Sequence, residues 1–211
     1  ADSFWQHQTQ NHTELITPKK ARILSINHFS FGFVRNPFDR LVAAYNNKVI
    51  EIDEPPLPMQ NMGITHGMPF ENFLDVLIDT PFKQFDVHVL PQSQILCIGN
   101  KIVPKFVGRI EQIDAHWSEL RAALARRGIN VMKSLPQKNV RRSDRNGLES
   151  YFSSDSMIEK TFKIYGDDIR LFYSDVSVDH LIKNHPLPSI NPLQSKSLML
   201  SNWLRSHGIW H

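Results

Sequence analysis

The sequence predicts an α/β fold, with a parallel sheet flanked by helices in one domain. An apolar, aromatic run at 31–34 leads into a helical pattern at 37–45, and a second strand-like run at 106–111 leads into a helical pattern at 114–128. Residues 70–78 form a further amphipathic helical pattern. Strands that alternate with helices are typical of parallel sheets. A length of 211 residues favours a single domain.

The composition is that of an ordinary globular protein, and it limits the kinds of ligand and partner that the chain is expected to bind. Hydrophobic residues make up 41% and charged residues 21% of the chain. The net charge of +3 permits an anionic ligand, but the sequence lacks the strong basic stripe of a nucleic-acid-binding protein. Cys97 is the single cysteine, which excludes an intrachain disulfide and a multi-cysteine metal site. No apolar run approaches the ~20 residues of a membrane span, and the start does not resemble a signal peptide.

The stretch from Phe33 to Tyr45 combines the end of a predicted strand with the start of a predicted helix. Pro37 fixes φ at a value that suits the first helical position, and Asn36 lies where an N-cap is expected. Arg35 therefore falls between the carboxyl end of a strand and a helix N-terminus, where α/β folds bind anions such as phosphates. A guanidinium there adds charge-assisted contacts. The alternative is a strand, loop and helix whose arginine pairs with a surface acid.

The flanking segments follow simpler patterns. Residues 1–20 are polar, with a possible short helix opening at 13–15, and residues 24–33 form a candidate core strand region. Prolines and glycines predict a long loop at 51–68, which is a candidate border of an acceptor site. In the amphipathic helix 70–78, the residues that face inward are Phe70, Phe73, Leu74 and Leu77.

The second half of the chain is predicted to contain two long helices. Asp114 caps the first, and Gly128 ends it. Residues 151–173 form the second. Between them, the loop 135–148 carries four cations that form either an anion-binding surface or an ordinary solvated loop. These cations are Lys138, Arg141, Arg142 and Arg145.

FVRNPFDRLVAAYNNK, residues 33–48, resembles the 3′-phosphate-binding segment of the carbohydrate sulfotransferase family, usually FVR-x-PF-x-RLVSAY. Members of this family move a sulfuryl group from 3′-phosphoadenosine 5′-phosphosulfate (PAPS) to a sugar hydroxyl, and their fold is similar to that of P-loop kinases. The resemblance implies that Arg35 grips the 3′-phosphate. Ala43 stands where the family has a serine. The missing hydroxyl removes a hydrogen bond worth about 0.5–1.5 kcal/mol, so weaker cofactor binding is expected.

Two other segments that resemble the family carry histidines. His12 stands 23 residues before Arg35, in the sequence HTEL, and by resemblance is the candidate general base, with His7 as its neighbour or substitute. Imidazole suits this role because its unperturbed pKa of about 6.5 lets it accept a proton at neutral pH. HVLPQSQIL resembles the family segment H-x-x-PQ-x-x-x-L, so its first residue, His88, is a candidate substrate contact or second base.

Three more segments extend the resemblance. LPQKNVRRSDRNGL resembles the family segment LPH-x-N-x-S, which implies that Arg141 and Arg142 are further cofactor contacts. FVGRIE resembles F-V-G-[RK]-x-E. Its Arg109 and Glu111 lie two residues apart on one face of the predicted strand, so we expect an ion pair that steadies the cleft, and the alternative is a direct phosphate contact. The residues that match the closing helix of the family are Tyr165, Asp168 and Phe172.

One expected feature is missing. The family's phosphate loop, IPK-x-x-[GS]-[ST]-like, does not precede Arg35, and the nearest approach is Pro18-Lys19-Lys20. Either the chain starts downstream of that loop or the loop has been lost. The predicted organisation is a sulfotransferase-like domain at 1–175 without this loop, followed by a C-terminal extension at 176–211 that contains a proline-spaced linker and a short helix.

The function expected from this resemblance is PAPS-dependent transfer of a sulfuryl group to a carbohydrate hydroxyl, with adenosine 3′,5′-bisphosphate as the product and without a metal. The expected partner is a glycan acceptor, not a nucleic acid. The alternative is a non-catalytic module that binds a glycan or an anion on a degenerate sulfotransferase core. The absent loop and Ala43 both favour this alternative. A cytoplasmic, bacterial-type location is expected, with the Golgi lumen as the alternative.

Overall fold

The structure is a computed structural model that describes residues 16–135 and 147–183. The helices in this part of the chain are α2 (Pro18–Asn27), α3 (Pro37–Tyr45), α4 (Leu57–Asn61), α5 (Phe70–Asp79), α6 (Gln92–Leu96), α7 (Ile113–Ala125), α8 (Leu148–Tyr151), α9 (Asp155–Phe172) and α10 (Val178–Lys183). The strands are β1 (Phe31–Val34), β2 (Cys97–Ile98), β3 (Lys101–Ile102) and β4 (Phe106–Arg109). Shorter turns are a π-helical turn at Asn46–Ile50 and 3₁₀ turns at Phe82–Gln84 and Ile110–Gln112.

β1 and β4 pair in parallel, which confirms the predicted α/β fold with a parallel sheet. In the described residues this sheet has two strands, and β2 and β3 form a separate antiparallel pair. The register runs to Val34 opposite Arg109, so both parallel strands end at the same edge. A Cβ atom on Gly108 would lie 2.5 Å from the ring of Phe33, so the strands and their side chains pack closely because residue 108 is a glycine.

Helix α3 begins as the sequence predicts. The Asn36 side chain accepts a hydrogen bond from the Phe38 N–H at 3.0 Å, and Pro37 occupies the first helical position. The apolar face of α3 is buried, and it comprises Phe38, Leu41, Val42, Ala44 and Tyr45. The cap and the buried face of α3 therefore fix the path of the chain from β1 into α3, at the carboxyl edge of the parallel pair.

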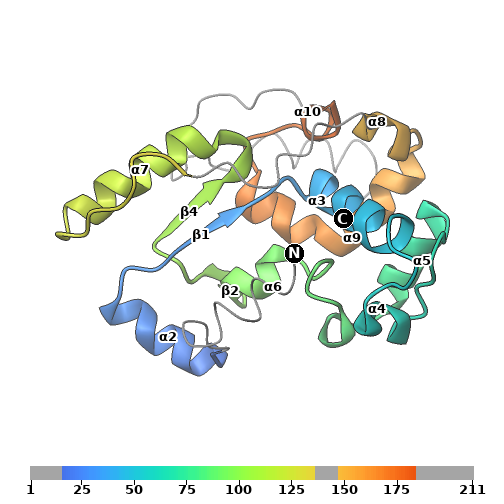
Figure 1. Cartoon of the computed structure of the whole chain (residues 1–211), viewed down its shortest axis with the longest axis horizontal. Helices are drawn as coiled ribbons and strands as arrows, with labels where there is room; N and C mark the ends of the chain where they lie inside the picture. The colour runs from blue at the N-terminus through green and yellow to red at the C-terminus, as the bar shows by residue number, and fades with distance from the viewer. Residues whose placement is uncertain (1–15, 136–146, 184–211) are drawn as a thin grey trace.

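Helix α9 is the central element of the hydrophobic core. It packs against α3, α5 and α6. Figure 1 shows α3 and α5 beyond the carboxyl ends of β1 and β4. Helix α7 follows β4 and packs against it. Helix α2 precedes β1 and lies at the opposite, amino end of that strand (Figure 1). Much of the helical core thus lies at the carboxyl end of the parallel pair.

Several predicted boundaries were wrong. In the candidate strand region 24–33, residues 24–27 are the end of helix α2, which Thr17 caps and Pro18 begins, and the strand β1 starts only at Phe31. Asp114 lies within the first turn of α7 and does not cap it. The predicted helix 151–173 is interrupted, since α8 ends at Tyr151 and α9 begins at Asp155. Gly128, with φ of 76°, does end the helical segment after α7.

The core continues past residue 175, where the sequence places the start of an extension. Val176, Val178 and Leu181 are buried in the same cluster as α3 and α9, so residues 176–183 belong to the packed body. None of the helices in the described residues is both long and apolar enough for a membrane span.

Candidate functional site

The loop between β1 and α3 is held by side chains from distant segments. The Gln92 side-chain amide donates from Nε2 to the Arg35 carbonyl and accepts at Oε1 from the Arg35 N–H, both at 2.8 Å. Glu111, just after β4, accepts a hydrogen bond from the Asn36 N–H at 2.5 Å. These contacts fix the backbone of Arg35 and Asn36 at the carboxyl edge of the parallel pair.

A buried carboxylate holds Gln92 in turn. Asp168 on α9 is fully buried and accepts hydrogen bonds from the N–H groups of Gln92 and Ser93, each at 2.7 Å. These are the first amides of α6, which have no partner within the helix, and the helix dipole favours a negative charge at this end. Asp168 therefore connects α9 to the Arg35 loop through Gln92.

Glu111 and Asn36 connect the same loop to the end of the described chain. The Tyr173 hydroxyl donates to Glu111 Oε2 at 2.9 Å. Burial raises the pKa of Tyr173, and the Glu111 carboxylate raises it further, so the hydroxyl remains a donor. The Asn36 side chain donates to the Leu181 carbonyl at 2.7 Å. The loop is thus supported by the residue after α9 and by α10.

The Arg35 side chain is partly exposed, with 36% of its surface accessible. Its Nε donates to Asp39 Oδ2 at 2.5 Å. Among the described residues, its two terminal nitrogens have no hydrogen-bond partner. The acid contact of the alternative interpretation is thus present at Nε, whereas the anion contact of Arg35 stays a prediction.

The backbone donors near Arg35 are mostly used within the protein. The N–H groups of Arg35 and Asn36 bind Gln92 and Glu111, and the Phe38 N–H binds the Asn36 side chain. An anion at this edge would therefore be recognised chiefly by the Arg35 side chain rather than by a row of free amides.

The predicted ion pair between Arg109 and Glu111 was wrong. Arg109 pairs with Asp175 through both terminal nitrogens, and its Nε donates to the Phe172 carbonyl at 2.9 Å. The reason is that β4 ends at Arg109 and Glu111 lies in a 3₁₀ turn, so the two residues do not share a strand face. The guanidinium also lies 4.8 Å from the centroid of the Tyr173 ring. Arg109 therefore ties the strand to the segment after α9.

His88 lies in the loop that precedes α6, with a carboxylate partner that the sequence did not predict. Its Nδ1 is 2.6 Å from Asp86 Oδ1, and the same oxygen accepts the His88 backbone N–H at 2.8 Å. Burial alone would raise the pKa of Asp86, but the hydrogen bonds from His88 outweigh it and hold that pKa below its usual value. The Asp86 side chain is 5% exposed, whereas the His88 side chain is 43% exposed.

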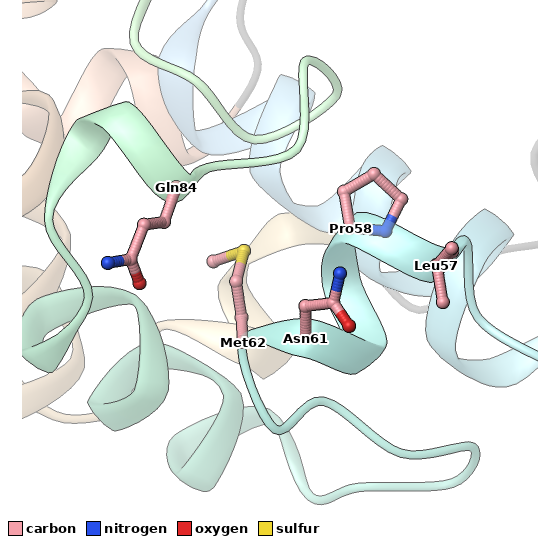
Figure 2. Close-up of a pocket in the computed structure, with 5 residues that line it drawn as sticks. All are labelled: Leu57, Pro58, Asn61, Met62 and Gln84. Atoms are coloured by element: carbon pink, nitrogen blue, oxygen red, sulfur yellow. The ribbon is translucent and has the colours of Figure 1, made fainter.

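A pocket of about 310 Å³ opens beside α4, within the segment that the sequence marks as a candidate border of the acceptor site. Figure 2 shows Gln84 facing Met62 from the opposite segment, with Asn61 at the end of α4 and Met62 directly after it. The lining side chains carry amides and apolar groups but no charge, which suits a neutral polar ligand better than a phosphate.

Four predicted site residues lie outside the described residues. They are His7, His12, Arg141 and Arg142, and their roles stay predictions. Ala43 is described, and it lies on α3 four residues after Asp39, so the two share one helix face. A serine at 43 would thus lie one turn beyond the acid that contacts Arg35.

Comparison with known proteins identifies the family of the chain. Residues 1–174 match the sequence pattern described as "Sulfotransferase family". The chain belongs to the sulfotransferase family. Carbohydrate sulfotransferase 10 of Danio rerio is 26% identical over 189 residues, which cover 77% of this sulfotransferase and 48% of the relative. The chain thus spans about half the length of this curated relative. No solved structure matches it.

Gln92 and Asp168 support the Arg35 loop of this sulfotransferase, and sequence reasoning assigned neither a role. One available signal was that Asp168 interrupts an apolar face, since Ile164, Asp168 and Phe172 recur every four residues on α9 and all are buried. A carboxylate on such a face needs hydrogen-bond donors from elsewhere in the fold. The sequence does not say which donors these are.

Proposed function

We propose that this sulfotransferase transfers a sulfuryl group from PAPS to a carbohydrate hydroxyl. Family membership supports the transfer of sulfate in general. The acceptor class rests on the relative whose printed name is a carbohydrate sulfotransferase. The observation that carries the proposal is the position of Arg35, whose backbone is held at the carboxyl edge of a parallel pair and whose two terminal nitrogens have no partner among the described residues.

PAPS, the proposed sulfuryl donor, is an anion and is therefore suited to bind beside the Arg35 guanidinium. When bound, PAPS supplies the sulfuryl group on a 5′-phosphate leaving group, and its ribose 3′-phosphate distinguishes it from ATP. Arg35 presents two parallel N–H groups, which match two phosphate oxygens. The Asp39 contact on Nε limits the rotation of the guanidinium and so orients this outer edge. The general base predicted from the sequence is His12, with His7 beside it.

Calorimetric titration with adenosine 3′,5′-bisphosphate tests the cofactor assignment. Saturable binding is expected, and Arg35→Ala is expected to weaken it at least about tenfold, because a charge-assisted hydrogen bond is worth about 1.5–3 kcal/mol. Adenosine 5′-phosphate, which lacks the 3′-phosphate, should bind the protein and the variant equally. If Arg35→Ala binds the bisphosphate as tightly as the unaltered protein does, the assignment of Arg35 is wrong.

A matched variant controls for the loss of positive charge. Arg22 is exposed on α2, which lies at the amino end of β1 and away from the Arg35 loop (Figure 1). Arg22→Ala removes the same charge and should leave the affinity for adenosine 3′,5′-bisphosphate within about twofold, because solvent and salt screen a charge at this distance.

A non-catalytic anion- or glycan-binding module is the second candidate. Two observations favour it: Ala43 replaces the family's serine, and the amides of Arg35 and Asn36 are already bound by side chains of the protein. This candidate predicts binding of adenosine 3′,5′-bisphosphate or of a glycan without any transfer of labelled sulfate from PAPS. Transfer by the unaltered protein excludes it.

A further inference from the structure

We propose that Asp86 and His88 form a dyad in which His88 is the general base of the transfer. This inference rests on the proposed function and assigns the proton acceptor to a described residue in place of His12. The geometry is that of an imidazole held by a carboxylate: Nδ1 of His88 lies 2.6 Å from Oδ1 of Asp86. The carboxylate is buried, and 43% of the histidine side chain faces solvent.

The carboxylate sets the tautomer of the ring. Asp86 Oδ1 accepts both the backbone N–H of His88 and the hydrogen on Nδ1, so one oxygen fixes the backbone and the ring of the same residue. With the proton on Nδ1, the lone pair is on Nε2. A carboxylate on Nδ1 also stabilises the imidazolium that forms when Nε2 accepts a proton.

The loop that carries Asp86 and His88 is held against α3, the helix that follows the Arg35 loop. Arg40 on α3 donates to the carbonyls of Leu90 and Val87, at 2.8 and 3.0 Å. The Tyr165 hydroxyl on α9 donates to the Val89 carbonyl at 2.7 Å. These three bonds reach both sides of His88, which keeps the dyad rigid beside α3.

The same segment also reaches Arg35 itself. Gln92, four residues after His88, binds the Arg35 backbone, while Arg40 lies five residues after Arg35. Arg40 lies in the first turn of α3, three residues after the helix begins at Pro37, which corresponds to a rise of about 4.5 Å. A base and a 3′-phosphate contact must be separated, because the ribose and the 5′-phosphate lie between the 3′-phosphate and the sulfuryl group. His88 is anchored beside Arg40, whereas Gln92 of the same segment binds the Arg35 backbone, so the two groups are held by different parts of one segment.

In the proposed step, His88 Nε2 accepts the proton of the acceptor hydroxyl as that oxygen bonds to sulfur, and the electron pair of the breaking sulfur–oxygen bond leaves with the 5′-phosphate. Asp86 keeps its hydrogen bond to Nδ1 throughout and acts as a positioning residue. Lys48 in the turn after α3 is a cation near the dyad and contributes to the lowered pKa of Asp86. Arg40 on α3 adds a second cation to this loop through its contacts with the carbonyls of Val87 and Leu90.

Three other described histidines, His28, His66 and His116, have different ring contacts. His28 and His66 place Nδ1 against the backbone carbonyls of Leu24 and Ile52. His116 is buried and accepts the Arg109 N–H at Nδ1. A backbone carbonyl carries no full charge and stabilises an imidazolium less than a carboxylate does. His28 is exposed and follows α2 at the amino end of β1, so His28→Ala is a suitable control for the loss of an exposed histidine.

The test compares His88→Asn, Asp86→Asn and the His28→Ala control. Sulfate transfer from labelled PAPS is measured with the best acceptor from a panel of monosaccharides, chondroitin and heparosan, and affinity for adenosine 3′,5′-bisphosphate is measured by calorimetry. His88→Asn should lower kcat by about 100-fold or more and abolish the acid limb of the kcat–pH profile. Its affinity for the bisphosphate should stay within about twofold, and His28→Ala should leave both quantities unchanged.

A readout independent of turnover is the ring ¹⁵N NMR spectrum of His88. Protonation at Nδ1 in the neutral ring is expected, and Asp86→Asn should abolish this preference and lower kcat by about tenfold or more. A neutral ring protonated at Nε2, or a kcat that survives His88→Asn, would overturn the dyad while leaving the proposed function intact. If the unaltered protein transfers sulfate to none of the acceptors, both the proposed function and the dyad are overturned. In every other case the effect of His88→Asn on kcat can be measured.

Discussion

The side-chain amide of Gln92 binds the backbone of Arg35 as a neighbouring strand would, with one hydrogen bond in each direction at 2.8 Å. Gln92→Leu leaves both backbone groups of Arg35 without these partners in a partly buried loop. The free energy of unfolding in urea should fall by about 1–3 kcal/mol. Affinity for adenosine 3′,5′-bisphosphate should fall more than affinity for adenosine 5′-phosphate. Gln94→Leu, on the exposed side of the same helix, should change neither affinity.

Asp168 and its neighbour Asp167 are two acids on α9 that differ in burial, so their variants can be compared directly. Asp168 is buried and accepts two amides of α6, whereas Asp167 is exposed and pairs with Arg170. Asp168→Asn should lower the free energy of unfolding by about 1.5–3 kcal/mol, because charge-assisted hydrogen bonds become neutral ones. Asp167→Asn should cost less than about 1 kcal/mol, as expected for a surface ion pair. Equal effects in urea unfolding would contradict the role of Asp168 as a buried cap.

The proposed phosphate contact can also be strengthened. Ala43→Ser restores the hydroxyl of the family pattern on the α3 face that carries Asp39. One added hydrogen bond of about 0.5–1.5 kcal/mol corresponds to about two- to tenfold tighter binding of adenosine 3′,5′-bisphosphate. Ala44→Ser is the control, since Ala44 is buried in the core and its hydroxyl would lower stability without improving binding. Calorimetric titration of both variants decides whether the α3 face contacts the phosphate.

The strand, loop and helix around Arg35 were predictable because their signals are local. Asn36 and Pro37 are adjacent to the residues whose conformation they set, and the apolar face of α3 repeats within nine residues. The groups that support the loop are not local. Gln92 is 57 residues from Arg35, and Asp168 is 76 residues from Gln92, so periodicity carries no information about either contact.

The partner of Arg109 shows why a correct motif can still give a wrong contact. Spacing by two residues implies a shared face only while the strand continues, and β4 ends at Arg109 itself. Glu111 then turns to the Asn36 N–H and the Tyr173 hydroxyl, both of which come from other elements. The position where a strand ends depends on its neighbours, and a single sequence does not contain that information.

The Arg109–Asp175 pair provides the strongest stability prediction. Both side chains are largely buried, at 12% and 5% exposure, and both terminal nitrogens of Arg109 contact the carboxylate. Arg109→Met should lower the free energy of unfolding by about 3–5 kcal/mol, because it leaves the Asp175 carboxylate buried without its cation. The double variant Arg109→Met, Asp175→Leu should recover much of this loss, since it removes the isolated charge as well. If the double variant is less stable than Arg109→Met in urea unfolding, the cost arises from lost packing of the arginine rather than from the unpaired acid.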